Sequence, residues 1–155
     1  MSKGRFVDVF VEPDSSEPSG YRFHMEEGGK RRSMLQFNKN NDKMKKSEHY
    51  RIEFMLHNTK GADLRFSKIK GKVMWATEVP EPIEQCPAEG DGVEGFYVDP
   101  TEYPNDRKLH VINTDMKVQF LSFALNFVPD GTQEGPDTQY ICFDPIIANE
   151  NGGYN

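Results

Sequence analysis

The chain has little cysteine and no long hydrophobic run. Its two cysteines, Cys86 and Cys142, lack the C-x-x-C spacing of a metal or redox site and form no zinc pattern with the four histidines. Disulfides are rare in the cytosol, so we expect two ordinary thiols. No apolar run approaches the roughly 18 residues of a membrane-spanning helix, and the N-terminal run Phe6–Val11 contains an Asp, which is untypical of a signal peptide. These absences predict a cytoplasmic protein with no metal, no cofactor and no membrane partner.

Helical periodicity is missing as well. No apolar pattern of period 3.6 persists for three turns, whereas alternating runs such as Tyr50–Leu56 recur between Gly- and Pro-containing turns. Only 35% of the residues are hydrophobic, but 11 Phe, 6 Tyr and one Trp can fill a thin core. About eight short strands joined by turns predict one all-β domain, an antiparallel β-sandwich, with a closed β-barrel as the alternative.

Residues 78–107 differ from the rest of the chain. Five prolines and three glycines make a helix or a long strand unexpected there. Long irregular segments inside compact domains are usually functional, so this insertion could carry a partner site. Trp75, Phe96, Tyr97 and Tyr103 could form its aromatic surface, although Trp75 ends an apolar strand and is expected in the core.

The net charge of −6 hides an asymmetry. Residues 22–72 contain 14 Lys and Arg against 6 Asp and Glu, whereas residues 78–155 contain 3 against 15. The run Lys30-Arg31-Arg32 could contact phosphates. The acidic isoelectric point of about 5.2 favours instead a fold in which basic and acidic strands lie side by side, with no nucleic-acid partner.

The run from Lys117 to Val128 has the clearest strand pattern. Residues 121, 123, 125 and 127 are apolar and share one parity, which is typical of a strand with one buried face. Lys117 has the same parity, so an unbroken strand turns it inward, whereas a bulge near Phe120 would turn it outward. Burial favours the neutral, nucleophilic form of a lysine amine.

The bond between Asp144 and Pro145 is the main candidate for chemistry. The Asp carboxylate can reach its own carbonyl carbon in a five-membered ring, and the leaving proline nitrogen is a comparatively basic secondary amine. Proline cannot donate a ladder hydrogen bond, so the strand should be interrupted here or lie at an edge. A fold that desolvates Asp144 and supplies a proton donor could break the bond at neutral pH. The dipeptide occurs a second time, at Asp99-Pro100.

The C-terminal segment resembles the end of the DP-EP family of small bacterial proteins. The resemblance rests on Asn113-Thr114-Asp115, the strand Lys117–Phe127, Asp130-Gly131 and the run Phe143-Asp144-Pro145-Ile146-Ile147-Ala148-Asn149. Members of this family are described as β-sandwiches that act as self-cleaving aspartic endopeptidases. They cut an Asp-Pro bond near the C-terminus, keep the tail as a strand, and can link a Lys to that Asp as a side-chain amide.

The resemblance implies roles for three residues. Asp144 would be the scissile residue, Pro145 the new N-terminus, and Lys117 the amine that forms the amide. We choose Asp115 as the carboxylate that activates water because it lies beside Lys117, with Asp99 or Asp137 as alternatives.

Two functions therefore compete. In the first, the protein cleaves itself, and tail residues 145–155 remain bound or exchange between copies, so that its partner is itself in a homo-oligomer. In the second, it is a non-enzymatic binding module with its partner site on residues 78–107. No motif of a hydrolase acting on external substrates is present.

Overall fold

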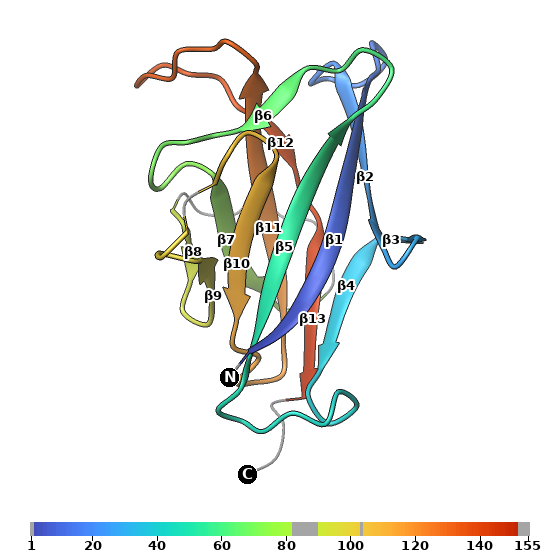
Figure 1. Ribbon diagram of the computed structural model, residues 1–155, viewed down its shortest axis with the longest axis vertical. Helices are drawn as coiled ribbons and strands as arrows, with labels where there is room; N and C mark the ends of the chain where they lie inside the picture. Colours follow the sequence, from blue (N-terminus) through green and yellow to red (C-terminus); the bar gives the residue numbers. More distant parts are fainter. Residues whose placement is uncertain (1, 82–89, 103, 152–155) are drawn as a thin grey trace.

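The computed structural model describes residues 2–81, 90–102 and 104–151, and it is all-β (Figure 1). Two sheets face each other without closing into a barrel, which confirms the β-sandwich. No helix in the described part of the chain could cross a membrane. The described residues form thirteen strands, more than the expected eight.

Sheet A has seven strands, in the order β3 (Lys30–Arg32), β2 (Tyr21–Glu27), β1 (Ser2–Pro13), β5 (His49–Asn58), β10 (Lys108–Asn113), β9 (Phe96–Val98) and β8 (Gly92–Val93). Sheet B is built around β11 (Gln119–Pro129). One side of β11 pairs with β7 (Met74–Val79) and β6 (Leu64–Phe66), and the other with β13 (Ile146–Asn151) and β12 (Ile141–Phe143); β4 (Met34–Asn38) lies beyond β13.

Most strand pairs are antiparallel, as expected, but each sheet also contains one parallel pair. Strand β1 is parallel to β5, and β4 is parallel to β13, as the arrows in Figure 1 show. Between β1 and β5 the chain forms the β2–β3 hairpin, crosses at Ser33 to sheet B as β4, and returns. This return brings β5 in from the same end as β1. The alternation of apolar and polar residues along single strands could not reveal such a connection between the sheets.

The core follows the predicted alternation. Val7, Val9 and Val11 of β1 are almost fully buried, and Phe123 of β11 packs against Phe54 and Phe96 of sheet A, with ring centroids 5.9 and 5.3 Å apart. The opposite face of β11 is buried too. Its Asn126 side chain donates to the Lys72 carbonyl at 2.7 Å, so the chain between β6 and β7 covers that face.

Part of the charge asymmetry is neutralised inside the fold. Basic residues of the first half pair with carboxylates of the second half: Arg51 with Asp99, Arg65 with Glu134 and Lys68 with Asp106. These pairs place basic and acidic segments side by side. The Arg65–Glu134 pair is the most buried of the three, and its oxygens also accept from the Lys68 backbone and the Ser67 hydroxyl.

The described part of the insertion forms the short β8–β9 hairpin. Gly92 has φ +119°, and a Cβ there would lie 2.2 Å from the Phe96 carbonyl oxygen, so the hairpin requires glycine. Phe96 is completely buried and belongs to the core. The insertion is therefore anchored to the sandwich by its own aromatic residue. Residues 82–89 and Tyr103 lie outside the described residues.

Candidate functional site

The Asp144-Pro145 bond lies in a break between two strands. Phe143 at the end of β12 is opposite Leu125, and Ile146 at the start of β13 is opposite Ser122, both on the same side of β11. The break is the interruption that the sequence predicts for proline. The Pro145 carbonyl accepts a hydrogen bond from the Phe123 N–H at 3.1 Å, which fixes the chain on the tail side of the bond.

The tail after this bond is an interior strand. Strand β13 pairs antiparallel with β11 and parallel with β4. Ile146, Ile147 and Ala148 are buried, with 9%, 0% and 2% of their surface exposed. Backbone pairing on both edges and apolar burial would therefore hold this segment even without its covalent link.

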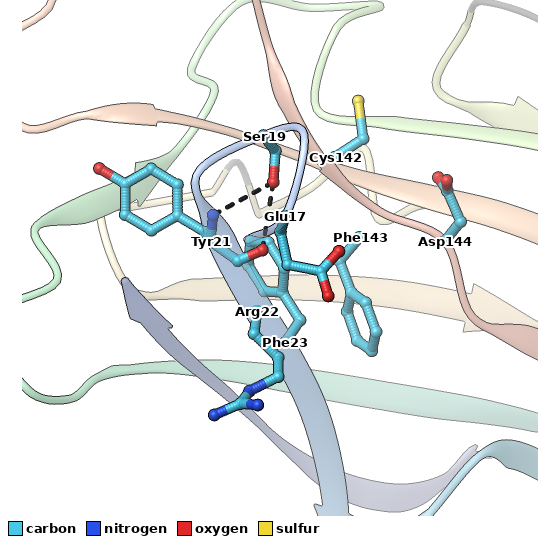
Figure 2. A pocket seen from close by; sticks show the side chains of 8 residues that line it. All are labelled: Glu17, Ser19, Tyr21, Arg22, Phe23, Cys142, Phe143 and Asp144. Carbon is cyan, nitrogen blue, oxygen red and sulfur yellow. Dashed lines mark hydrogen bonds between the residues drawn. The ribbon is translucent and has the colours of Figure 1, made fainter. Parts of the chain in front are cut away.

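Stacked aromatic rings close the edge of the sandwich beside the bond. Phe23 of β2 stacks on Phe143 of β12, with centroids 5.3 Å apart and planes 11° from parallel, and also on Phe127. Figure 2 shows Phe143 beside Phe23, whereas Cys142 and Asp144 point away from this pair. The Asp144 side chain is exposed. The fold does not desolvate this carboxylate, contrary to the condition set out above.

Two clefts flank the aromatic pair, and Asp144 lines both. The smaller, of about 230 Å³, appears in Figure 2 and is lined by Glu17, Ser19, Tyr21, Arg22, Phe23, Cys142, Phe143 and Asp144. The larger, of about 500 Å³, is called here the arginine cleft. It is lined by Phe23, His24, Arg31, Arg32, Ser33, Phe143, Asp144 and Pro145. The chain that crosses from β3 to β4 forms one of its walls.

Lys117 is not near Asp144. Strand β11 begins at Gln119, opposite Asn149, so Lys117 precedes the strand and lies near the far end of β13. About seven strand positions separate it from Asp144, which corresponds to roughly 20 Å. Its side chain is 64% exposed, and Nζ lies 2.9 Å from a Glu78 carboxylate oxygen. Both expected orientations assumed a strand reaching residue 117, but the chain bends at Lys117 and the strand starts only at Gln119.

Asp115 is also far from the Asp144-Pro145 bond, in a buried polar cluster at the other end of β13. It is 1% exposed, and neither carboxylate oxygen has a hydrogen-bond partner in the described residues. Burial raises the pKa of Asp115 to about 7, although the nearby positive charge of Lys39 acts in the opposite direction. Of the four predicted site residues, the structure brings together only Asp144 and Pro145.

The cluster contains residues that sequence reasoning missed. Lys39 is fully buried, and its Nζ donates to the Lys46 carbonyl at 3.0 Å. Asn113 and Asn149 exchange two side-chain amide hydrogen bonds, of 2.9 and 3.2 Å. The only sequence signal was that Asn149 directly follows the apolar run 146–148. The polar stretch around Lys39 looked like an exposed loop.

A third cavity lies beside the insertion and is called here the tyrosine groove. It measures about 620 Å³ and is lined by Glu78, Val93, Glu94, Gly95, Tyr97, Thr114, Met116, Lys117 and Gln119. Tyr97 is the member of the predicted aromatic surface that lines it. Trp75 was expected in the core, but it is only half-buried. Its ring packs edge-on against Tyr140, with the two ring centroids 6.4 Å apart.

The thiol chemistry of the described residues is limited to one cysteine. Cys142 is not in a disulfide, and its Sγ lies 3.0 Å from the Asn126 side-chain oxygen. Cys86 lies outside the described residues. Residues 2–81, 90–102 and 104–151 contain no group of three or more His, Cys, Asp or Glu side chains arranged to hold a metal ion.

Comparisons with known proteins add little to this geometry. No family model matches the chain, and no curated protein matches it significantly. A crystal structure described as an inclusion body protein (PixA) from Burkholderia cenocepacia aligns over 94% of this chain and 96% of its own, at 9% sequence identity and a TM-score of 0.31. A likeness this weak supports no conclusion about function.

Proposed function

We propose that this protein cleaves its own Asp144-Pro145 bond and keeps the C-terminal segment as strand β13. The observation that carries the proposal is the position of the bond. It lies in a strand break whose two flanks are both paired with β11. The scissile segment is thus presented between two fixed strands, and its product needs no rearrangement to stay folded.

The reaction uses the atoms of the dipeptide itself. The Asp144 carboxylate attacks its own carbonyl carbon and closes a five-membered ring. The bond to the Pro145 nitrogen breaks, that nitrogen takes a proton from water, and Asp144 is left as a cyclic anhydride. Hydroxide or water then opens the anhydride. The net reaction adds one water across the peptide bond and leaves two carboxylates on Asp144.

The cleaved tail would remain in place because its backbone pairing with β11 and β4, and not its covalent link to β12, holds it in the sheet. Exchange of the tail between copies requires breaking the contacts with both β11 and β4 and exposing Ile147. Exchange is therefore slow, and self-assembly by strand addition occurs at high protein concentration or under partial denaturation.

The side-chain amide between Lys117 and Asp144 is not part of this proposal. The two residues lie at opposite ends of β13, and the Lys117 ammonium pairs with Glu78. Water is the acceptor of the acyl group in this arrangement.

Denaturing intact-mass spectrometry tests the proposal. Wild-type protein should give two fragments, one ending at Asp144 and one starting at Pro145, whose masses add up to the full chain plus one water. Asp144→Ala should remain intact while keeping the same fold by circular dichroism. A single full-length mass for the wild type after days at mildly acidic to neutral pH would contradict self-cleavage, and so would equal cleavage in Asp144→Ala.

A second candidate function is a binding module at the tyrosine groove. The observation in its favour is the cavity itself, in which Tyr97 and Val93 offer apolar surface among Glu78, Glu94 and Lys117. Deleting the whole insertion would remove Phe96 from the core, so a point substitution is the better test. Ligand-detected NMR with a fragment library should find compounds that bind wild type and Asp144→Ala equally and lose binding in Tyr97→Ala. The absence of any such compound would exclude this candidate.

A further inference from the structure

The fold places an arginine next to the scissile bond. Parallel pairing of β4 with β13 sets Met34 opposite Ile146. Two residues before each of these lie Arg32 and Asp144, and both line the arginine cleft. The chain crossing from sheet A to sheet B therefore brings Arg32 beside the bond, although the two residues are separated by more than a hundred positions in the sequence.

Strand register assigns the carbonyl of Asp144 to the side of this crossing chain, because Phe143 and Ile146 keep one continuous register against β11 across the break. The next carbonyl, that of Pro145, accepts from the Phe123 N–H and so points toward β11. Successive carbonyls of an extended chain point to opposite sides. The Asp144 carbonyl oxygen therefore faces away from β11, toward the side on which Ser33 and Arg32 pass.

The side chain of Arg32 projects from the inner face of the β2–β3 hairpin. Arg32 is opposite Met25, which is 1% exposed and packs in the core. Residues directly opposite each other in an antiparallel pair share a face, so Arg32 projects on the side turned toward sheet B. Arg31 is opposite Glu26 and projects on the outer side.

The guanidinium of Arg32 is available for an anion. The two nearby carboxylates of β2 already have partners: Glu26 lies 2.8 Å from His24 Nε2, and Glu27 accepts from Arg5 at 2.7 Å. Arg32 is exposed and forms no ion pair with a carboxylate of the described residues. A guanidinium presents several N–H donors in one plane, which suits a carboxylate or a tetrahedral oxyanion.

We infer that Arg32 forms the oxyanion site of the cleavage reaction, and that the same cleft afterwards holds the carboxylates left on Asp144. The inference rests on the proposed function. Because Asp144 is exposed, the fold does not activate its carboxylate by desolvation, and Arg32 instead stabilises the negative charge that develops during the attack. As the carboxylate attacks, the C=O double bond opens and negative charge collects on the carbonyl oxygen that faces Arg32. When the C–N bond breaks, the C=O double bond forms again and the electron pair of the broken bond leaves with the Pro145 nitrogen, which takes a proton from water. Ring opening by water then creates both carboxylates of Asp144.

The rate of cleavage tests this role. Freshly synthesised protein from cell-free translation is followed by mass spectrometry for wild type, Arg32→Ala, Arg32→Lys and Arg22→Ala. Arg22 is the matched control because it lines the smaller cleft and pairs with Glu12 at 2.7 Å. We expect Arg32→Ala to slow cleavage by about 100-fold, the typical effect of removing one oxyanion donor, with partial activity in Arg32→Lys and no change in Arg22→Ala.

Chemical rescue separates this role from a structural one. Guanidinium ion at tens of millimolar should accelerate Arg32→Ala and leave wild type unchanged. In a second arm, sulfate is titrated into Asp144→Ala protein and the arginine Nε–H signals are followed by NMR. Sulfate should shift the Arg32 signal, and Arg32→Ala should remove that response.

The outcomes distinguish the two proposals. Cleavage of wild type with an equal rate in Arg32→Ala would overturn the oxyanion role and leave self-cleavage standing. No cleavage of wild type would overturn the proposed function and, with it, the catalytic part of the inference. Absence of a saturable sulfate shift at Arg32 would overturn the anion site itself, whichever result the cleavage experiment gives.

Discussion

The two Asp-Pro bonds of this chain have the same covalent chemistry and different surroundings. Asp99 follows strand β9 and is 7% exposed. One of its carboxylate oxygens accepts from the Thr101 N–H at 2.9 Å and from the Thr101 hydroxyl at 2.8 Å, and the other accepts from Arg51 Nε at 3.2 Å. Although burial acts in the opposite direction, these hydrogen bonds lower the pKa of Asp99.

Asp144 differs from Asp99 in its exposure and in its position between two strands. It is exposed, it lies in a strand break, and it lines a cleft together with Arg32. A carboxylate held by three hydrogen bonds must break them before it can close the ring, and each costs about 1 kcal/mol or more when charged groups take part. Burial and these hydrogen bonds therefore make Asp99-Pro100 the weaker candidate of the two bonds.

The largest effect is expected from removing the leaving group. Pro145→Ala replaces the basic secondary amine by an ordinary amide nitrogen, so cleavage should slow by at least about 100-fold. The Pro145 carbonyl bond to Phe123 is kept, so the tail should stay docked. Intact-mass spectrometry measures the fragments. Pro100→Ala is the matched control and should leave the fragment pattern of wild type unchanged, whereas fragments ending at Asp99 in any of these proteins would break the comparison.

Asp115 extends the comparison to an aspartate that is buried without hydrogen-bond partners. The pKa of Asp115 is raised to about 7, so its carboxyl is protonated in both folded and unfolded chains below about pH 4. Between about pH 4 and 7 only the unfolded chain ionises, and stability is lost as the pH rises through the folded pKa. Asp115→Asn removes this loss.

We therefore expect Asp115→Asn to stabilise the protein by about 2–4 kcal/mol at pH 8 and by little at pH 4. Urea unfolding in the Asp144→Ala background measures the difference at both pH values. Asp42→Asn is the control, since Asp42 is also near the cluster but accepts a hydrogen bond from Tyr50. A gain at pH 8 that persists unchanged at pH 4 would show that ionisation of Asp115 is not its cause.

A smaller effect is expected at the anchored Asp-Pro bond. Thr101→Val removes the hydroxyl bond to Asp99 and keeps the backbone N–H bond and the Arg51 contact. Stability should fall by about 1 kcal/mol, because one hydrogen bond to a charged group is lost. Denaturant midpoints measure this change, and mass spectrometry should still show an intact Asp99-Pro100 bond. A loss of more than about 3 kcal/mol would mean that Thr101 has a further role.

The smallest effect is expected at Lys117. Its exposed ion pair with Glu78 contributes at most about 1 kcal/mol, so Lys117→Ala should change stability little and leave the cleavage rate as in wild type. The mass of the larger wild-type fragment should be that of a free Asp144 terminus. A fragment lighter by one further water that disappears in Lys117→Ala would show that the far end of β13 can reach Asp144 after all.

Several features followed from local sequence because they depend on neighbouring residues. Alternation in the run 121–127 predicted which side chains of β11 enter the core, and proline chemistry predicted the strand break at Pro145. The Phe and Tyr content was enough to indicate a thin two-sheet core. These properties need only the pleat of a strand and the missing proton on a proline nitrogen.

Other features depended on contacts that no local pattern contains. Both orientations considered for Lys117 assumed a continuing strand, but β11 starts only at Gln119 and the chain bends at Lys117. The burial of Lys39 and the pairing of Asn113 with Asn149 come from segments far apart in the sequence.

The sequence by itself thus determined an all-β chain with two chemically equivalent Asp-Pro bonds. Only the tertiary structure distinguished the two bonds. Thr101 and Arg51 anchor Asp99, whereas the crossing from β3 to β4 brings Arg32 beside Asp144. The physical reason is that reactivity depends on which charges and donors surround a bond. Those neighbours are assembled by parallel pairing and by a crossing between sheets, which join residues that are distant in the chain.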